Sequence, residues 1–261
     1  KAEKFETENL TYKKVEKLPL PLISENERGY IVQVDKRKNK LVEEIKKLIE
    51  NLEDLIKEDD KTLPRVYFHE SLYVPILLQS KEIDKISPAG LVESEIKFIK
   101  GLKNYLEEHK NVLNFEIYLL RNYPFSGVGF QLQWSKFYPD FIMWIRKDKK
   151  QIIVFIDPKG LEHTKGLDDE KIVFAGFCPQ HLGVVTIKDI ERKLSEELNK
   201  TTDPTIVLES FILSNTPYNN LIKGMVSPPS KEEYINHHVL FLEDKDWVEK
   251  LFSALGLQSL Q

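Results

Sequence analysis

Two short apolar runs separated by a polar stretch constrain the fold of this chain more than any other feature. Residues 141–145 and 152–156 are rich in β-branched and aromatic side chains, so each run is predicted to be a strand. The polar residues 146–151 between them suit a hairpin turn. A turn centred in the middle of that stretch places Asp140, just before the first run, opposite Asp157, just after the second. The sequence therefore predicts an antiparallel hairpin in which two carboxylates face each other, with Cβ atoms roughly 5 Å apart.

The residues around this carboxylate pair predict a bound cation. Lys159 follows Asp157 by two positions, so its side chain is expected on the same face of the strand. Opposed and buried carboxylates repel each other unless a cation neutralises them. Mg²⁺ suits hard oxygen ligands supplemented by water, and Mn²⁺ is a possible substitute. The alternative interpretation is a solvated Asp–Lys cluster at two strand ends, each next to a strand-breaking proline.

The same residues resemble the PD-(D/E)xK nuclease superfamily. Pro139-Asp140 is followed, 157 − 140 = 17 residues later, by Asp157-x-Lys159. The surrounding sequence, over about residues 69–241, is similar to the nuclease part of type III restriction enzyme Res subunits and related helicase-nucleases. The segments that carry this likeness are Glu116-Ile117-Tyr118-Leu119-Leu120-Arg121-Asn122, Gly127-Val128-Gly129-Phe130, Phe137-Tyr138-Pro139-Asp140-Phe141-Ile142 and Val154-Phe155-Ile156-Asp157-Pro158-Lys159-Gly160-Leu161.

This resemblance implies a restriction-endonuclease-like core that cleaves DNA with Asp140 and Asp157 as metal ligands and Lys159 acting on the nucleophile. It also implies a helicase motor ahead of the nuclease and a modification subunit as partners. The chain contains no GxxxxGK[ST] string, so an ATP site is expected outside it. Because the chain opens on a lysine, we expect it to be a C-terminal piece of a larger protein.

A third acidic residue is expected on a helix packed over the sheet. Ser87 is predicted to be the N-cap and Pro88 the first residue of that helix. Leu91, Glu95, Phe98 and Leu102 share one stripe, which turns Glu95 inward. We therefore expect Glu95 to complete the metal site, with Glu93 as the substitute. An acid near a helix start is also favourable without any metal, and the sequence leaves both readings of Glu95 open.

Composition limits the class of protein. The hydrophobic fraction of 41% among 261 residues supports a large core. No apolar run approaches the ~20 residues that span a bilayer, and the single cysteine, Cys178, fits a reducing, cytoplasmic setting. The net charge is −4, but residues 111–165 hold 8 Lys and Arg against 5 Asp and Glu. Basic residues thus gather around the predicted site, where they could meet phosphates. For Lys149 and Lys150 at the hairpin tip, an ordinary solvated loop is an equally good interpretation.

Strands and helices are predicted to alternate, which indicates an α/β core with a mixed sheet. Residues 1–62 are expected to form a connector with an amphipathic helix at 39–58, and residues 63–261 the nuclease-like domain. Within that domain, strands are predicted at 115–120 and 205–214, and helices around 166–174 and 244–254. The function predicted is that of an Mg²⁺-dependent endonuclease. A catalytically silent module that docks DNA or a partner protein is the rival, and an RNA-directed nuclease would share the same chemistry.

Overall fold

The computed structural model describes residues 31–33, 40, 43, 65–66, 76–77, 85–87, 91–122, 128–132, 135–162, 164, 166–176, 185–198 and 205–257. The predicted helix 39–58 and Cys178 lie largely or wholly outside these residues. None of the described helices is long and apolar enough to cross a membrane.

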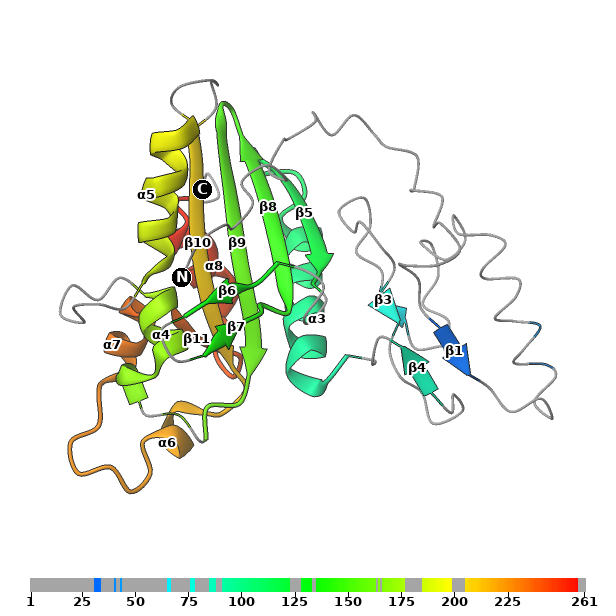
Figure 1. The fold of residues 1–261 in the computed structure, drawn as a ribbon. Coiled ribbons are helices and arrows are strands. Elements are labelled where there is room, and N and C mark those ends of the chain that lie inside the picture. The colour runs from blue at the N-terminus through cyan, green and yellow to red at the C-terminus, as the bar shows by residue number, and fades with distance from the viewer. Residues whose placement is uncertain are drawn as a thin grey trace.

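The centre of the molecule is a mixed five-stranded sheet with the order β11-β10-β9-β8-β5 (Figure 1). Strands β5, β8 and β9 pair antiparallel, whereas β9, β10 and β11 pair parallel. The mixed sheet and its flanking helices confirm the predicted α/β class. The strands are β5 (Glu116–Arg121), β8 (Phe141–Lys147), β9 (Lys150–Lys159), β10 (Thr205–Ser214) and β11 (Val239–Phe241).

The hairpin at the centre of this sheet has the register that the sequence predicts. Phe141 pairs with Ile156 and Lys147 with Lys150. Asp148 lies in the turn with φ 52°, a left-handed conformation that Asp tolerates better than most residues. The next pair beyond Phe141 and Ile156 would be Asp140 and Asp157, so both aspartates lie at the same end of the hairpin.

Helices cover both faces of the sheet because the strands are apolar on both sides. One core cluster joins alternate strand residues, such as Met143 and Val154, to α3 and α8; Figure 1 shows these helices behind the sheet. A second cluster joins the intervening residues, such as Ile142 and Phe155, to α4, α5 and the small β6–β7 hairpin. A third cluster packs α4, α6 and α7 against β11. The helices are α3 (Glu93–Glu108), α4 (Glu170–Ala175), α5 (Ile187–Leu198), α6 (Tyr218–Leu221), α7 (Lys231–Asn236) and α8 (Trp247–Ala254), with the 3₁₀ turn η2 (Gly166–Asp168) before α4.

The predicted start of α3 is wrong. Ser87 does not cap a helix, because it is the last residue of β4 (Lys85–Ser87), where it pairs with Ile31 of β1 (Ile31–Gln33). The helix begins six residues later, after the N-cap Val92. Its inward stripe nevertheless holds as predicted, since Leu91, Phe98 and Leu102 are all buried in the main core.

The remaining elements match the sequence prediction to different degrees. Strand β10 has the predicted bounds, η2 and α4 occupy the predicted region at 166–174, and α8 begins three residues later than expected. Helix α5 is not among the predicted elements. Three further two-stranded sheets are formed by β1 with β4, by β2 (Arg65–Val66) with β3 (Ile76–Leu77), and by β6 (Phe130–Gln131) with β7 (Lys136–Phe137).

Candidate functional site

Asp140 and Asp157 form the centre of the candidate site. Asp157 lies in β9 and is buried, with 6% of its surface exposed, and Asp140 directly precedes β8. Burial raises the pKa of Asp140 to about 8, and the negative charges of Asp157 and Glu95 raise it as well, against a lowering by Arg121. Hydrogen bonding to the carboxyl of Asp157 raises the pKa of Asp140 further. The two aspartates therefore face each other closely, as the sequence predicts.

Lys159 completes this end of β9. Its Nζ lies 3.1 Å from Oδ2 of Asp157, so the two side chains share one face of the strand. The backbone here is fixed by parallel pairing with β10, in which Ser214 is the partner of Lys159. The amide of Asn215 donates to the carbonyl of Lys159 at 2.9 Å. The ammonium is thus held beside the carboxylate pair by the sheet itself.

Glu95 joins the two aspartates from α3. It is 6% exposed, and its Oε2 accepts a hydrogen bond from the Val92 amide at 2.7 Å. The same oxygen lies 3.7 Å from Nη2 of Arg121. Burial raises the pKa of Glu95, the Val92 amide and Arg121 lower it, and the charge of Asp157 raises it. Both interpretations of Glu95 therefore have a physical basis, because it serves the helix start and also lies within the electrostatic reach of the aspartates.

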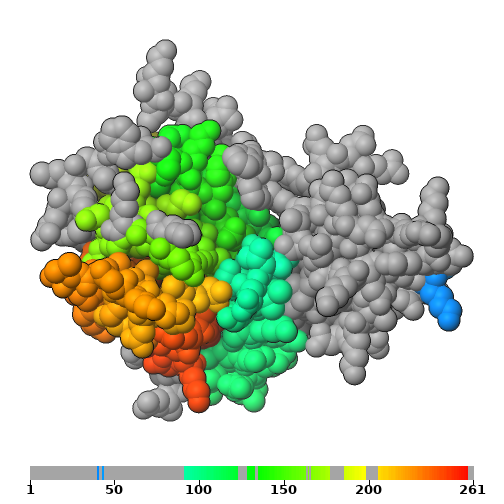
Figure 2. Space-filling model, turned by 90° about the horizontal axis from the view of Figure 1, so that it is seen from below, coloured from blue at the N-terminus to red at the C-terminus, as the bar shows by residue number. Residues whose placement is uncertain are grey.

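Glu93, the substitute acid, is placed differently. Its side chain is exposed and pairs with Lys97 of the same helix at 2.9 Å. Lys97 also donates to Oδ1 of Asn215 at 2.8 Å, and Oγ of the buried Ser94 donates to the carbonyl of Pro158 at 2.8 Å. These bonds fasten the first turn of α3 to the ends of β9 and β10; Figure 2, which views the molecule from below, shows α3 bordering the segment that follows β10. The structure thus brings Glu95, and not Glu93, to the aspartates.

The donor set can be compared with the needs of a metal ion. Within the part of the chain that the structure describes, no group of three or more His, Cys, Asp and Glu side chains is arranged to hold one. Asp140 and Asp157 are the pair that could do so, because both provide hard oxygen atoms and a cation would reverse the raised pKa of Asp140. Glu95 already accepts a hydrogen bond from the Val92 amide, so it is suited to contact a metal ion through a water molecule rather than directly.

Asn122 positions Asp140, and sequence reasoning assigned it no role. Its buried side-chain amide donates to the carbonyls of Pro139 at 2.8 Å and of Val128 at 2.7 Å, and its Oδ1 accepts from the Val128 amide at 2.9 Å. Its backbone amide donates to the carbonyl of Asp140 at 2.8 Å. Asn122 therefore ties the Pro139-Asp140 segment to the end of β5. The only signal in the sequence was a polar pair, Arg121 and Asn122, directly after an apolar strand.

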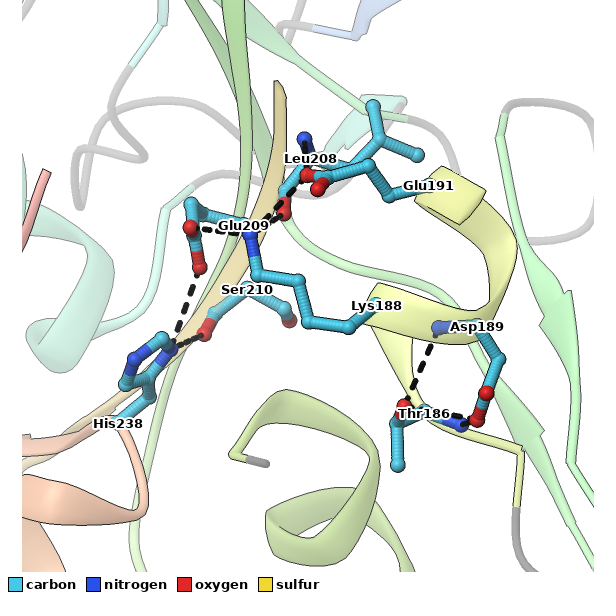
Figure 3. A network of polar contacts seen from close by, with 8 residues as sticks. All are labelled: Thr186, Lys188, Asp189, Glu191, Leu208, Glu209, Ser210 and His238. Atoms are coloured by element: carbon cyan, nitrogen blue, oxygen red, sulfur yellow. Dashed lines mark hydrogen bonds and ion pairs between the residues drawn. The ribbon is translucent and has the colours of Figure 1, made fainter. Parts of the chain in front are cut away.

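A second polar cluster lies along the edge of β10 that β11 covers only in part (Figure 3). Strand β11 pairs with β10 only from Ile212 onward, and no other strand among the described residues pairs with the earlier residues of β10 on that side. Lys188 and Glu191 of α5 take the place of such a strand. Lys188 donates to the carbonyl of Leu208 at 2.9 Å, and Glu191 accepts from the amide of the same residue at 2.6 Å.

His238 continues this cover along the strand. Its Nδ1 lies 3.0 Å from the carbonyl of Ser210, so this nitrogen carries the proton and donates. Burial lowers the pKa of His238 and keeps the imidazole neutral, although the neighbouring Glu209 opposes this. Glu209 in turn forms an ion pair with Lys188. Because its contacts satisfy backbone groups and pair charges within the fold, we assign this cluster to the protection of a sheet edge.

Comparison with known proteins adds no relative. No protein-family model matches the chain, and no curated protein or solved structure matches it. The case for a function therefore rests on the geometry of Asp140, Asp157, Lys159 and Glu95 and on the motif that they form.

Proposed function

We propose that this chain is a metal-dependent nuclease domain that hydrolyses phosphodiester bonds of DNA. The observation that carries the proposal is the close pair of Asp140 and Asp157, in which the pKa of Asp140 is raised to about 8, beside the ammonium of Lys159. Keeping two buried carboxyl groups side by side costs free energy, here through the proton that Asp140 retains at neutral pH, and a bound cation would offset that cost. The order of the motif residues along the chain and the mixed sheet also support a restriction-endonuclease-like core.

Asp140 and Asp157 would hold Mg²⁺, or Mn²⁺ in its place, and Glu95 would support it through water. A hard divalent ion at such a site lowers the pKa of a bound water and stabilises negative charge on a phosphoryl oxygen. The backbone contacts of Asn122 and the pairing of β9 keep the two carboxylates in place before any substrate arrives. This preorganisation is what an electrostatic catalyst requires.

Lys159 would act on the reacting water and phosphate. Its ammonium is already adjacent to Asp157, so it can orient a water beside the carboxylates or neutralise charge that develops on the phosphate. Arg121 brings a second positive charge to the three carboxylates. With Asp140 ionised the cluster would carry three negative and two positive charges, which is a moderate attraction for a divalent ion.

The rival function is a silent module that docks DNA or a partner protein. A module without chemistry has no physical need for buried like charges and a lysine together, and this favours the enzyme. In keeping with the motif, we place the domain as the cleavage module of a type III restriction-like helicase-nuclease. Its motor, modification subunit and choice of site would then lie outside this chain.

Cleavage of supercoiled plasmid by this chain, with Mg²⁺ and with EDTA, tests the proposal. We expect nicking or cutting with Mg²⁺ that Asp140→Asn abolishes. Asp148→Asn is the matched control, because it makes the same change at the exposed turn of the same hairpin, where Asn also tolerates the positive φ. Equal cleavage by both variants, or cleavage that persists in EDTA, would refute the role of the aspartate pair. Absence of cleavage by the wild type, alone and with its motor, would favour the silent module.

A further inference from the structure

A partly exposed strip of sheet is formed by Tyr118 and Leu120 of β5 and Trp144 of β8, whereas Ile142, between Trp144 and Asp140, is buried. Asp140 directly precedes β8, and Ile142 and Trp144 lie on the face of this strand opposite to that of Phe141 and Met143. Tyr118 is the partner of Trp144 across the ladder, and Leu120 is the partner of Ile142. The described elements that cover this face are α4, α5 and the β6–β7 hairpin, which pack mainly over β9 and β10 (Figure 1).

The strip is aromatic and partly exposed. Tyr118 is 42% exposed, and Trp144 and Leu120 are half-buried. Trp144 packs on the core cluster beneath it, which fixes one aromatic side chain in place. The Tyr118 hydroxyl donates to Oε2 of Glu116 at 3.2 Å, and Glu116 is bound in turn by Arg146 at 2.8 Å. The second aromatic side chain is therefore also held before any ligand arrives.

Charge changes sign along the strip. At one end are the acidic residues of the candidate site. At the other, residues 146–150 at the β8–β9 turn contain Arg146, which is paired with Glu116, and three lysines against the single carboxylate of Asp148. Tyr118 itself carries no charge at neutral pH, and burial and the neighbouring Glu116 raise its pKa above the ordinary value of 10.0. An anionic ligand would therefore be attracted to the turn and could cross the aromatic residues without meeting an unpaired negative charge.

We propose that Tyr118 and Trp144 form a stacking platform for unpaired bases of a DNA strand whose backbone leads to Asp140 and Asp157. Aromatic side chains that accept bases, combined with positive charge that follows phosphates, are the general means of binding single strands. Trp144 lies four residues along β8 from Asp140, so the platform is roughly 13 Å from the carboxylates. A paired duplex hides its base faces, and the platform thus selects frayed, nicked or single-stranded DNA. This inference rests on the proposed nuclease function for the direction of the strand.

The platform can be tested by binding alone, without cleavage. Fluorescence anisotropy in EDTA would compare a labelled single strand of about 12 nucleotides, within the usual range of single-strand sites, with its duplex. Tyr118→Leu removes the ring and keeps apolar cover on the strand, while Tyr118→Phe keeps the ring and loses only the bond to Glu116. We expect Tyr118→Leu to weaken single-strand binding by roughly 5- to 150-fold, the range for one stacked base. Tyr118→Phe should bind nearly as the wild type does.

Further measurements separate stacking from charge and from folding. Duplex affinity should be unchanged in Tyr118→Leu, and the dependence of single-strand affinity on salt should keep its slope because no phosphate contact is lost. An unchanged melting temperature would show that the variant is folded. The platform is refuted if the wild type does not bind single strands, if Tyr118→Leu binds as the wild type does, or if both variants lose equally. Because no metal is present, these outcomes are independent of whether Asp140→Asn abolishes cleavage.

Discussion

Asp140→Asn is expected to change the pH dependence of stability, because Asp140 has a pKa of about 8 in the folded protein against an ordinary value of 3.8. Between these values the folded chain holds a proton that the unfolded chain has released. The stability that Asp140 contributes is therefore fully present below about pH 4 and is lost as the pH rises through about 8. The slope from this one group is about −1.4 kcal/mol for each pH unit. Asn does not titrate, so the variant lacks this slope.

The free energy of unfolding of Asp140→Asn should thus rise relative to that of the wild type by at most about 3 kcal/mol between pH 5 and pH 7. Urea unfolding of both proteins in EDTA across this range measures the difference. The free energy of unfolding of Asp148→Asn, at the exposed turn, should change with pH in parallel with that of the wild type. If the curves of Asp140→Asn and the wild type were also parallel, or if the variant were the less stable protein at pH 7, the carboxyl of Asp140 would not be held against Asp157, and the argument for a cation site would fail.

Three further substitutions test the surroundings of the site. Lys159→Ala should retain Mg²⁺ binding in calorimetric titration but lose plasmid cleavage, since the ammonium is not a ligand; cleavage at the wild-type rate would remove Lys159 from the mechanism. Asn122→Ala loses three side-chain hydrogen bonds and should lower the free energy of unfolding by about 3 kcal/mol in urea. Gly129→Ala should lower it by about 1–3 kcal/mol, because a Cβ there would lie 2.3 Å from the ring of Tyr138. Unchanged unfolding midpoints would contradict the packing and bonding described for these two residues.

The central hairpin could be predicted from sequence because its signals are local. Two β-branched runs and a polar turn fix the register once the turn centre is known, and the register in turn places Asp140 opposite Asp157. The ten residues of β10 were equally clear for the same reason. In both cases nothing distant along the chain was needed to decide the outcome.

The start of α3 could not be predicted because a distant partner decides it. Ser87-Pro88 is a good local start for a helix, yet Ser87 pairs with Ile31, more than fifty positions earlier in the sequence. Helix α5 was within reach, since Ile187, Ile190 and Leu194 repeat at helical spacing and all contact the second core cluster. The role of Asn122 could not be predicted from the sequence, because its partners Val128 and Pro139 approach it only through the chain path between β5 and β8.

Glu95 can stabilise the start of its helix and also belong to the candidate site, so these two interpretations do not exclude each other. At the third position of α3, a carboxylate that accepts the Val92 amide stabilises the helix start, an effect of about 1 kcal/mol for a typical cap. The same bond fixes the carboxylate 3.7 Å from Arg121 and within reach of the charge of Asp157. The burial that raises its pKa is thus offset in part by the helix that presents it. The start of a helix therefore suits an acidic residue of a metal or substrate site, because local structure holds its charge in position before any metal or substrate is bound.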